Sequence, residues 1–249
     1  MLLDLDGTLV DHDGAARRGL VGWLTHQKLV GEDRCLDDLV ALWDDVAERH
    51  FPAFRAGEIT FQEQRRRRLR DFLPHLGLRV EHLGETALDR TFADYLQHYE
   101  AAWRAFDDVV PCLTSLRHVR LAVLSNGDQA QQEDKLRRTG LARFFEVVIA
   151  SSSLGAAKPD PEAFALACER LAVAPASVAY VGDRLDVDAR AATAAGLRGV
   201  WLDRRALGSG EHEPTISSLA DLAGVLGRGP AAAAELSRRV RGGPAGPRS

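Results

Sequence analysis

Short apolar runs rich in β-branched residues alternate with helical patterns along the second half of this chain. A strand that is buried on both faces of a sheet reads as a continuous apolar run, so the alternation predicts βαβ units and a parallel sheet. Leu2-Leu3-Asp4 adds one further strand at the start of the chain. An α/β fold is therefore expected, with its later strands at residues 120–124, 145–150, 178–181 and 199–202.

Three helices between these strands carry start or stop signals. They are expected over about residues 129–140, 161–171 and 187–195. Asp160 is a suitable N-cap, and Pro161 then takes the first helical position, where a backbone N–H is not needed. Gly196 is expected to stop the third helix, because glycine readily adopts the left-handed conformation found at helix ends.

Between residues 14 and 107 the apolar residues step by three and four, which is the pattern of amphipathic helices. Thr60-Phe-Gln-Glu63 also fits a capping box that opens a helix. The expected fold class is thus a Rossmann-like parallel sheet with helices on both faces, formed by 1–13 and 108–226, plus an inserted all-helical cap over 14–107. The stepped residues are Leu36, Leu39, Val40, Trp43 and Val46, then Leu88, Phe92, Tyr95, Leu96, Tyr99 and Trp103.

The end of the chain has a different composition. Residues 227–249 are rich in Gly, Pro, Ala and Arg, and they are expected to be disordered apart from a short helix near 231–240. No apolar run anywhere reaches the roughly 18 residues of a membrane span, and no basic-then-apolar leader precedes the first motif. The net charge of −4 gives no electrostatic footprint for nucleic acid or an anionic membrane. We therefore expect a cytoplasmic protein with neither as a partner.

The chain strongly prefers arginine to lysine, because Lys28, Lys135 and Lys158 are its only lysines among 32 basic residues. A lysine kept against this bias is a candidate for a position that requires one, which draws attention to Lys158. The run Arg65–Arg68 would point in four directions on a helix, so we expect a solvated helix; the alternative is that one or two arginines reach a negatively charged substrate. Three cysteines without a C-x-x-C pair, Cys35, Cys112 and Cys168, are expected to be small buried apolar residues.

In an open parallel sheet ligands bind beyond the carboxyl ends of the strands, so the polar residues that follow each predicted strand are candidates for a site. Asp4 and Asp6 follow the first strand, Ser125-Asn126 follows the second, and Lys158 lies in the loop beyond the third. Each motif alone can be explained as a turn or a solvated loop. Four such motifs, one after each of four successive predicted strands, instead predict a single functional site. The fourth strand is followed by Asp183, Asp186 and Asp188.

A carboxylate pair, a hydroxyl, an ammonium group and further carboxylates suit phosphoryl transfer, in which a nucleophile attacks phosphorus and nearby charges stabilise the transferring group. Several acids and a phosphate dianion cannot share a pocket unaided, so a hard divalent cation is expected, with Mg²⁺ as the cofactor. Ser125 and nearby backbone N–H groups are expected to bind phosphoryl oxygens. Lys158 is expected to supply a compact positive charge.

In these motifs the chain resembles the haloacid dehalogenase-like hydrolase superfamily, in the branch with a helical cap inserted after the first motif. The resemblance covers about 1–13 and 108–202. It implies that Asp4 attacks phosphorus to form an aspartyl-phosphate, while Asp6 protonates the leaving oxygen and then activates the hydrolytic water. It also implies that Ser125, with Asn126 beside it, binds the phosphoryl group and that Lys158 neutralises it.

The same resemblance implies a Mg²⁺ site. Asp183 is the implied ligand, and the side chain of Asp4 and the backbone carbonyl of Asp6 complete the protein ligands. Asp186 and Asp188 are both available as the further acid; the family's usual helix start favours Asp188 and leaves Asp186 as an N-cap. Only three residues precede Asp4, fewer than the family's central strand usually has, which fits either a native start upstream of Met1 or a short strand.

The function implied is a Mg²⁺-dependent phosphatase that hydrolyses a small phosphorylated metabolite, acting as a monomer or a homodimer. Two alternatives stay open: a phosphomutase of the same superfamily, and a non-catalytic phosphate-binding module. A dehalogenase is disfavoured, because those enzymes have no proton-shuttling acid at the position of Asp6.

Overall fold

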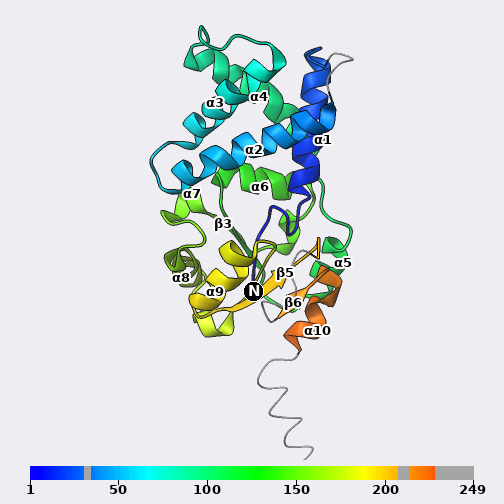
Figure 1. Ribbon diagram of the computed structural model, residues 1–249. Helices are drawn as coiled ribbons and strands as arrows, with labels where there is room; N and C mark the ends of the chain where they lie inside the picture. Colours follow the sequence, from blue (N-terminus) through cyan, green and yellow to red (C-terminus); the bar gives the residue numbers. More distant parts are fainter. Residues whose placement is uncertain (31–34, 207–213, 228–249) are drawn as a thin grey trace, which may run out of the picture. The chain divides into compact units, whose positions relative to one another are not determined.

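The structure is a computed structural model that describes residues 1–30, 35–206 and 214–227 (Figure 1). The chain divides into two compact units: Met1–Leu9 together with the chain from Ala105 onward, and Val10–Arg104 between them. These divisions lie a few residues before the predicted domain boundaries at 13/14 and 107/108. Beyond Gly227, the predicted tail and its short helix lie outside the described residues.

A six-stranded parallel sheet forms the centre of the first unit, in the order β3-β2-β1-β4-β5-β6. This confirms the predicted fold class. β1 is only two residues long, yet it lies between β2 and β4, and both of its leucines are fully buried. The two-residue strand β6 was not predicted, because two residues are too few to form a recognisable apolar run. The strands are β1 Leu2–Leu3, β2 Ala122–Ser125, β3 Val147–Ala150, β4 Ala179–Gly182, β5 Arg198–Leu202 and β6 Thr215–Ile216.

The helices predicted after β2 and β3 are present. Asp160 caps α8 as expected, since its side chain accepts a hydrogen bond from the backbone N–H of Glu162 at 2.9 Å. The third predicted helix is different: it begins as a π-helical turn, Leu185–Ala189, and continues as α9. α8 and α9 pack on one face of the sheet through residues such as Phe164 and Ala192. The α-helices are α5 Val109–Ser115, α6 Gln129–Arg138, α7 Ser151–Leu154, α8 Pro161–Arg170, α9 Arg190–Ala194 and α10 Leu222–Leu226.

The second unit, in its described residues, is built from four α-helices: α1 His12–His26, α2 Leu36–Arg55, α3 Phe61–Phe72 and α4 Glu85–Ala101. The predicted capping residue opens α3, where the Thr60 hydroxyl accepts from the Glu63 backbone N–H at 3.1 Å. Trp43 lies at the centre of the apolar core, with the rings of Phe72 and Tyr95 packed edge-on against it at 4.9 and 4.7 Å. The three-and-four spacing of apolar residues therefore identified helices that pack on one another.

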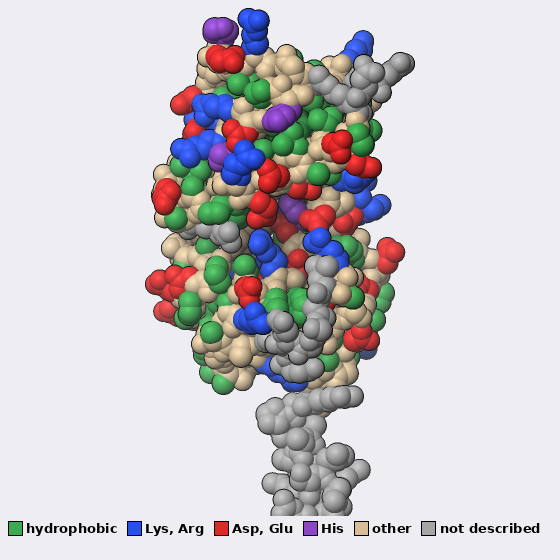
Figure 2. Space-filling view, viewed as in Figure 1, with side chains coloured by type: hydrophobic (Ala, Val, Ile, Leu, Met, Phe, Trp, Pro, Cys, Tyr) green, Lys and Arg blue, Asp and Glu red, His purple; other side chains and the backbone are tan. Residues whose placement is uncertain are grey.

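Two expectations about side chains hold only in part. The arginine run on α3 is not simply solvated, because Arg66 makes two 2.7 Å hydrogen bonds to Asp89 and the Arg68 guanidinium stacks 4.2 Å from the Trp43 ring centroid. Cys112 and Cys168 are buried as expected, whereas Cys35 is exposed. Figure 2 shows acidic and basic side chains interspersed on the viewed surface, as expected where arginines pair with acids. Among the described residues, none of the helices is both long and apolar enough to span a membrane.

Candidate active site

The end of β1 places Asp4 at the carboxyl edge of the sheet. The Asp4 backbone N–H donates to the Val181 carbonyl at 2.8 Å, which continues the parallel pairing with β4 up to the carboxylate itself. The chain then turns at Gly7, whose φ is +80°. A side chain at Gly7 would put its Cβ 2.4 Å from a carboxylate oxygen of Asp183, so glycine allows these two loops to approach.

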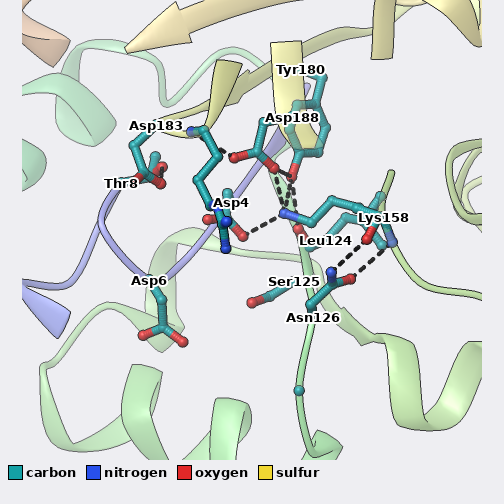
Figure 3. Close-up of polar contacts among 12 residues, drawn as sticks. Asp4, Asp6, Thr8, Leu124, Ser125, Asn126, Lys158, Tyr180, Asp183 and Asp188 are labelled. Atoms are coloured by element: carbon teal, nitrogen blue, oxygen red, sulfur yellow. Dashed lines mark hydrogen bonds and ion pairs between the residues drawn. The ribbon is translucent and has the colours of Figure 1, made fainter. Parts of the chain in front are cut away.

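Three carboxylates from two loops converge at this edge. Asp4, Asp183 and Asp188 each offer one oxygen, and the three oxygens lie within 4.8 Å of one another (Figure 3). Asp4 is 6% exposed and Asp188 fully buried. The hydroxyl of Thr8 donates to Asp183 at 3.1 Å, which holds that carboxylate toward the cluster. Sequence reasoning singled out the acids but not Thr8.

Lys158 joins the cluster from the loop after β3. Its Nζ donates to Asp4 at 2.7 Å, to Asp188 at 2.6 Å and to the hydroxyl of Tyr180 at 2.7 Å. An ammonium group has three N–H donors, so each has an acceptor here. The Tyr180 hydroxyl in turn lies 3.0 Å from the Leu124 carbonyl, to which it can donate. Tyr180 was overlooked in the sequence because it lies inside a predicted apolar strand.

The electrostatics of the cluster call for more positive charge than Lys158 provides. Burial raises the pKa of Asp4 to about 8, even though Lys158 opposes the shift. Burial and the charge of Asp188 raise the pKa of Asp183 to about 6. Burial alone would lower the pKa of Lys158, but Asp188 and Asp4 outweigh it and the net shift is upward, so the ammonium stays charged. Three carboxylates this close together are poorly ionised without a further cation. Their oxygens are hard donors of the kind that Mg²⁺ prefers, so the cluster fits this ion.

The structure brings Asp188, and not Asp186, to this cluster. The π-helical turn after β4 directs Asp188 inward, where its second oxygen accepts from the Arg184 backbone N–H at 3.0 Å. The side chain of Asp186 is 79% exposed and pairs with Arg190 at 2.8 Å. The N-cap position of the turn belongs to Arg184, so the expectation that Asp186 is an N-cap is wrong.

Ser125 and Asn126 lie side by side after β2 but have different environments. The Ser125 hydroxyl oxygen accepts from the Gln132 side chain at 3.1 Å, which leaves its own proton available for a further hydrogen bond. The Asn126 side chain instead binds the backbone of Lys158, donating to its carbonyl at 2.7 Å and accepting from its N–H at 2.9 Å. Asn126, which was expected to help bind the phosphoryl group, instead fixes the loop that carries Lys158.

Asp6 lies apart from the three clustered acids, and Figure 3 shows its side chain pointing away from them. Its carboxylate accepts from Lys135 Nζ at 2.6 Å and from Gln132 Nε2 at 3.1 Å. The resemblance implied only the backbone carbonyl of Asp6 as a metal ligand, which is compatible with this arrangement. Lys135 and Gln132 were not among the predicted site residues, although the rarity of lysine could have pointed to Lys135 as it did to Lys158.

The close approach at Gly7 gives a prediction about stability. Gly7→Ala is expected to lower the free energy of unfolding by about 2 kcal/mol or more, because left-handed backbone costs about 1–2 kcal/mol and the new methyl group collides with Asp183. Gly155→Ala is the matched control: its φ is +81°, but a Cβ there meets no atom within 4 Å. Urea unfolding of both variants measures the difference, and equal losses would show that the approach to Asp183 is not constrained.

Proteins similar to this chain include two named phosphatases and a hydrolase of known structure. The chain is 40% identical over 103 residues to glyceraldehyde 3-phosphate phosphatase of Methanopyrus kandleri, a match that spans 41% of this chain and 44% of that enzyme, and thus less than half its length. It is 27% identical to human N-acylneuraminate-9-phosphatase, with 91% of this chain and 92% of that protein covered. The structure of the HAD-hydrolase YfnB from Bacillus subtilis, bound to magnesium, superposes with a TM-score of 0.75 at 24% identity, covering 90% of this chain and 96% of that one.

The YfnB likeness supports the fold, and the family profile supports the assignment. Residues 1–196, which include Asp4, Ser125, Lys158 and the acids after β4, match the profile described as haloacid dehalogenase-like hydrolase. More than half of the chain is thus aligned, including every motif from which the site was built. The chain belongs to the haloacid dehalogenase-like hydrolase family.

Proposed function

We propose that the protein is a Mg²⁺-dependent phosphatase that hydrolyses the phosphate ester of a small metabolite, with Asp4 as the nucleophile. The observation that carries this proposal is the position of Asp4, buried at the end of β1 between a charged lysine and two further acids. A carboxylate that attacks a phosphate dianion needs positive charge beside it, here from Lys158 and from the metal ion that the three acids would hold, because the two negative charges otherwise repel. The two curated relatives described above are both named as phosphatases, which supports the same reaction class.

In the proposed first step, a carboxylate oxygen of Asp4 forms a bond to phosphorus as the bond from phosphorus to the leaving oxygen breaks. Asp6 gives its proton to that leaving oxygen, and the product alcohol departs. In the second step a water oxygen attacks phosphorus, Asp6 takes a proton from the water, and the bond between Asp4 and phosphorus breaks. Inorganic phosphate, the Asp4 carboxylate and the protonated Asp6 are the result.

The remaining residues have supporting roles in the proposal. Ser125 donates its free hydroxyl proton to a phosphoryl oxygen, and Lys158 keeps its charge beside Asp4 throughout. Mg²⁺, held by Asp4, Asp183 and Asp188, would supply further neutralisation of the transferring phosphoryl group. We propose that the helical unit, inserted between Leu9 and Ala105, acts as a cap that selects the substrate.

Phosphate release from a panel of sugar, nucleotide, amino-acid and glycolytic phosphates tests the proposal, with Mg²⁺ present and Asp4→Asn as the blank. Release well above the blank on at least one ester supports the phosphatase. Isomerisation of a sugar phosphate without released phosphate would favour a phosphomutase instead. Binding of phosphate esters with no turnover, unchanged in Asp4→Asn, would favour a binding module.

A second test uses the pKa values of the acids. Asp4 and Asp183 have pKa values raised to about 8 and about 6, so folding takes up protons in the range above the ordinary pKa of Asp. The metal-free protein therefore loses stability as pH rises from about 4 to about 8, because the buried acids become ionised. Bound Mg²⁺ compensates for this negative charge, so it stabilises the protein more at the upper end of the range. Thermal unfolding with EDTA or with Mg²⁺ should show a larger Mg²⁺-induced rise in Tm at about pH 8 than at about pH 5.

The expected size of the Mg²⁺ effect depends on how far its concentration exceeds its Kd, and two single substitutions serve as the test variant and its control. Mg²⁺ at about 100 times its Kd stabilises by about 2.7 kcal/mol. Asp188→Asn should reduce the Mg²⁺ response, whereas Asp186→Asn should leave it intact, because only the first of these side chains lies in the cluster. A response that is equal at both pH values, or equally reduced in both variants, would contradict the proposed metal site.

A further inference from the structure

The carboxylate of Asp6 is held by two side chains of one helix, α6. Lys135 Nζ donates to Oδ1 at 2.6 Å, and Gln132 Nε2 donates to Oδ2 at 3.1 Å. A single donor would leave the carboxylate free to rotate about its contact, whereas one donor on each oxygen fixes the plane of the group. Both oxygens therefore act as acceptors in a defined orientation.

The helix that supplies these donors is itself firmly placed. Gln132 and Lys135 are three residues apart, so they share one face of α6, and they are 2% and 1% exposed. The side chain of Gln129 ties the start of α6 to β3, donating to the Val148 carbonyl and accepting from the Ala150 N–H, both at 2.9 Å. The two donors are thus held in a fixed position relative to the sheet that carries Asp6.

Burying Lys135 requires a compensating interaction. Removing an ammonium group from water costs several kcal/mol unless an opposite charge repays it. The Asp6 side chain lies within 2.6 Å and is 25% exposed, so the pair combines a buried cation with an acid that remains accessible. A leucine or methionine would fill the space on α6 without this desolvation, so packing alone does not explain a charged residue at position 135.

Gln132 links Asp6 to the residue proposed to bind phosphate. Its Nε2 also lies 3.1 Å from the Ser125 hydroxyl oxygen, so one amide group contacts both side chains. A Cβ at Gly127 would approach this nitrogen to 2.7 Å, so the glycine keeps space for the amide. The orientation of Asp6 is thereby coupled to the position of the phosphoryl-binding hydroxyl.

We propose that Lys135, assisted by Gln132, is a positioning residue that holds Asp6 for the second half of the reaction, the hydrolysis of the phosphorylated Asp4. The inference rests on the proposed phosphatase function. With a donor on each oxygen, Asp6 is arranged as an acceptor: as a water oxygen bonds to phosphorus, a water proton moves to Asp6 and the bond from Asp4 to phosphorus breaks. Lys135 acts only through Asp6.

Lys135→Met, measured with p-nitrophenyl phosphate and Mg²⁺, tests this role. The p-nitrophenolate group leaves without needing a proton, so kcat/KM reports attack by Asp4, whereas kcat reports the slower of the two half-reactions. General-base catalysis is worth about 10²–10⁴-fold, and we expect misplacement of the base to lower kcat by about 10–100-fold. KM should fall in parallel, so that kcat/KM stays within about 3-fold of the wild type.

A rapid-mixing experiment gives the more direct readout. If hydrolysis of the phosphorylated enzyme has become slow, Lys135→Met should release close to one p-nitrophenolate per active site in a burst before the steady state. Lys135→Arg, which keeps the positive charge, should recover part of kcat. Arg137→Met, on the same helix with a side chain that is 72% exposed, is the matched control and should behave as the wild type.

A double-mutant cycle separates positioning from a general effect on folding. In an Asp6→Asn background, Lys135→Met should have little further effect on kcat, because the group through which it acts is already changed. Equal losses in kcat and kcat/KM without a burst, or a full additional loss in that background, would overturn the inference while leaving the phosphatase intact. A wild-type protein that hydrolyses no ester would instead overturn the proposed function, and this inference with it.

Discussion

Asp4→Asn is expected to lower kcat by about 10⁴-fold or more on any ester that the wild-type protein hydrolyses, because an amide cannot replace the carboxylate that we propose as the nucleophile. The substitution keeps the size of the side chain. It also removes the charge that burial disfavours, as the pKa of about 8 for Asp4 shows. The metal-free variant should therefore be at least as stable as the wild type at neutral pH, which separates loss of chemistry from loss of folding.

Phosphate release and chemical unfolding, measured on the same preparations, test both halves of this expectation. Asp186→Asn is the control, since it removes an exposed acid from the same group of motifs and should keep its activity. Turnover by Asp4→Asn that stays within about 10-fold of the wild type would exclude Asp4 as the nucleophile. A fully unfolded variant would contradict the view that burial of this charge opposes folding.

Lys158→Met is expected to have the largest effect on stability. It would leave Asp4, Asp188 and the Tyr180 hydroxyl without their shared donor in a region where Lys158 is 3% exposed. Removing one partner of a buried ion pair costs about 3–5 kcal/mol. We expect that loss for the metal-free protein near neutral pH and above, together with a fall in activity.

The pH dependence of this loss follows from the sign of each shift. The pKa of Lys158 is raised on folding, so its stabilising contribution is fully present below its unfolded pKa and is lost only as pH rises through the higher folded value. Asp4, with its pKa raised to about 8, is ionised mainly toward the alkaline side of that value. The variant should thus lose less stability at about pH 5 than at about pH 8, because Asp4 is protonated at the lower pH.

Urea unfolding in EDTA at the two pH values measures this dependence. Lys28→Met is a suitable control, because Lys28 is exposed and its replacement should change the free energy of unfolding by no more than about 0.5 kcal/mol. A loss for Lys158→Met that is equally small, or that is larger at the acidic pH, would contradict the electrostatic account of the cluster.

Much of the fold could be predicted because its signals are local. Continuous apolar runs marked β2 to β5, and steps of three and four marked α2 and α4. The start of α9 could not be predicted in this way, because a π-helical turn depends on how Asp188 meets Gly182, where a Cβ would approach to 2.4 Å. β6 is too short to carry a pattern, and the packing of Arg68 on Trp43 depends on contact between two helices.

The candidate site shows the same division. Asp4, Ser125, Lys158 and Asp183 follow strands, so topology alone predicts that they meet. Lys135 lies instead on a helix, 129 residues from Asp6, and carries no motif of its own. Its role depends on which face of α6 points toward the sheet edge, and helical spacing leaves that choice open when the exposed and buried faces are both polar.

The position of β1 also has a consequence for synthesis of the protein. This strand is synthesised before both of its partners, β2 and β4, which begin at Ala122 and Ala179. At about 5–20 residues per second, the second partner emerges roughly 10–35 s after β1. The helical unit, whose contacts are local, can fold during that interval. Because β2 is made before β4, the strand that leads to Asp4 can pair on one side first, and it gains its second neighbour only when β4 has left the ribosome.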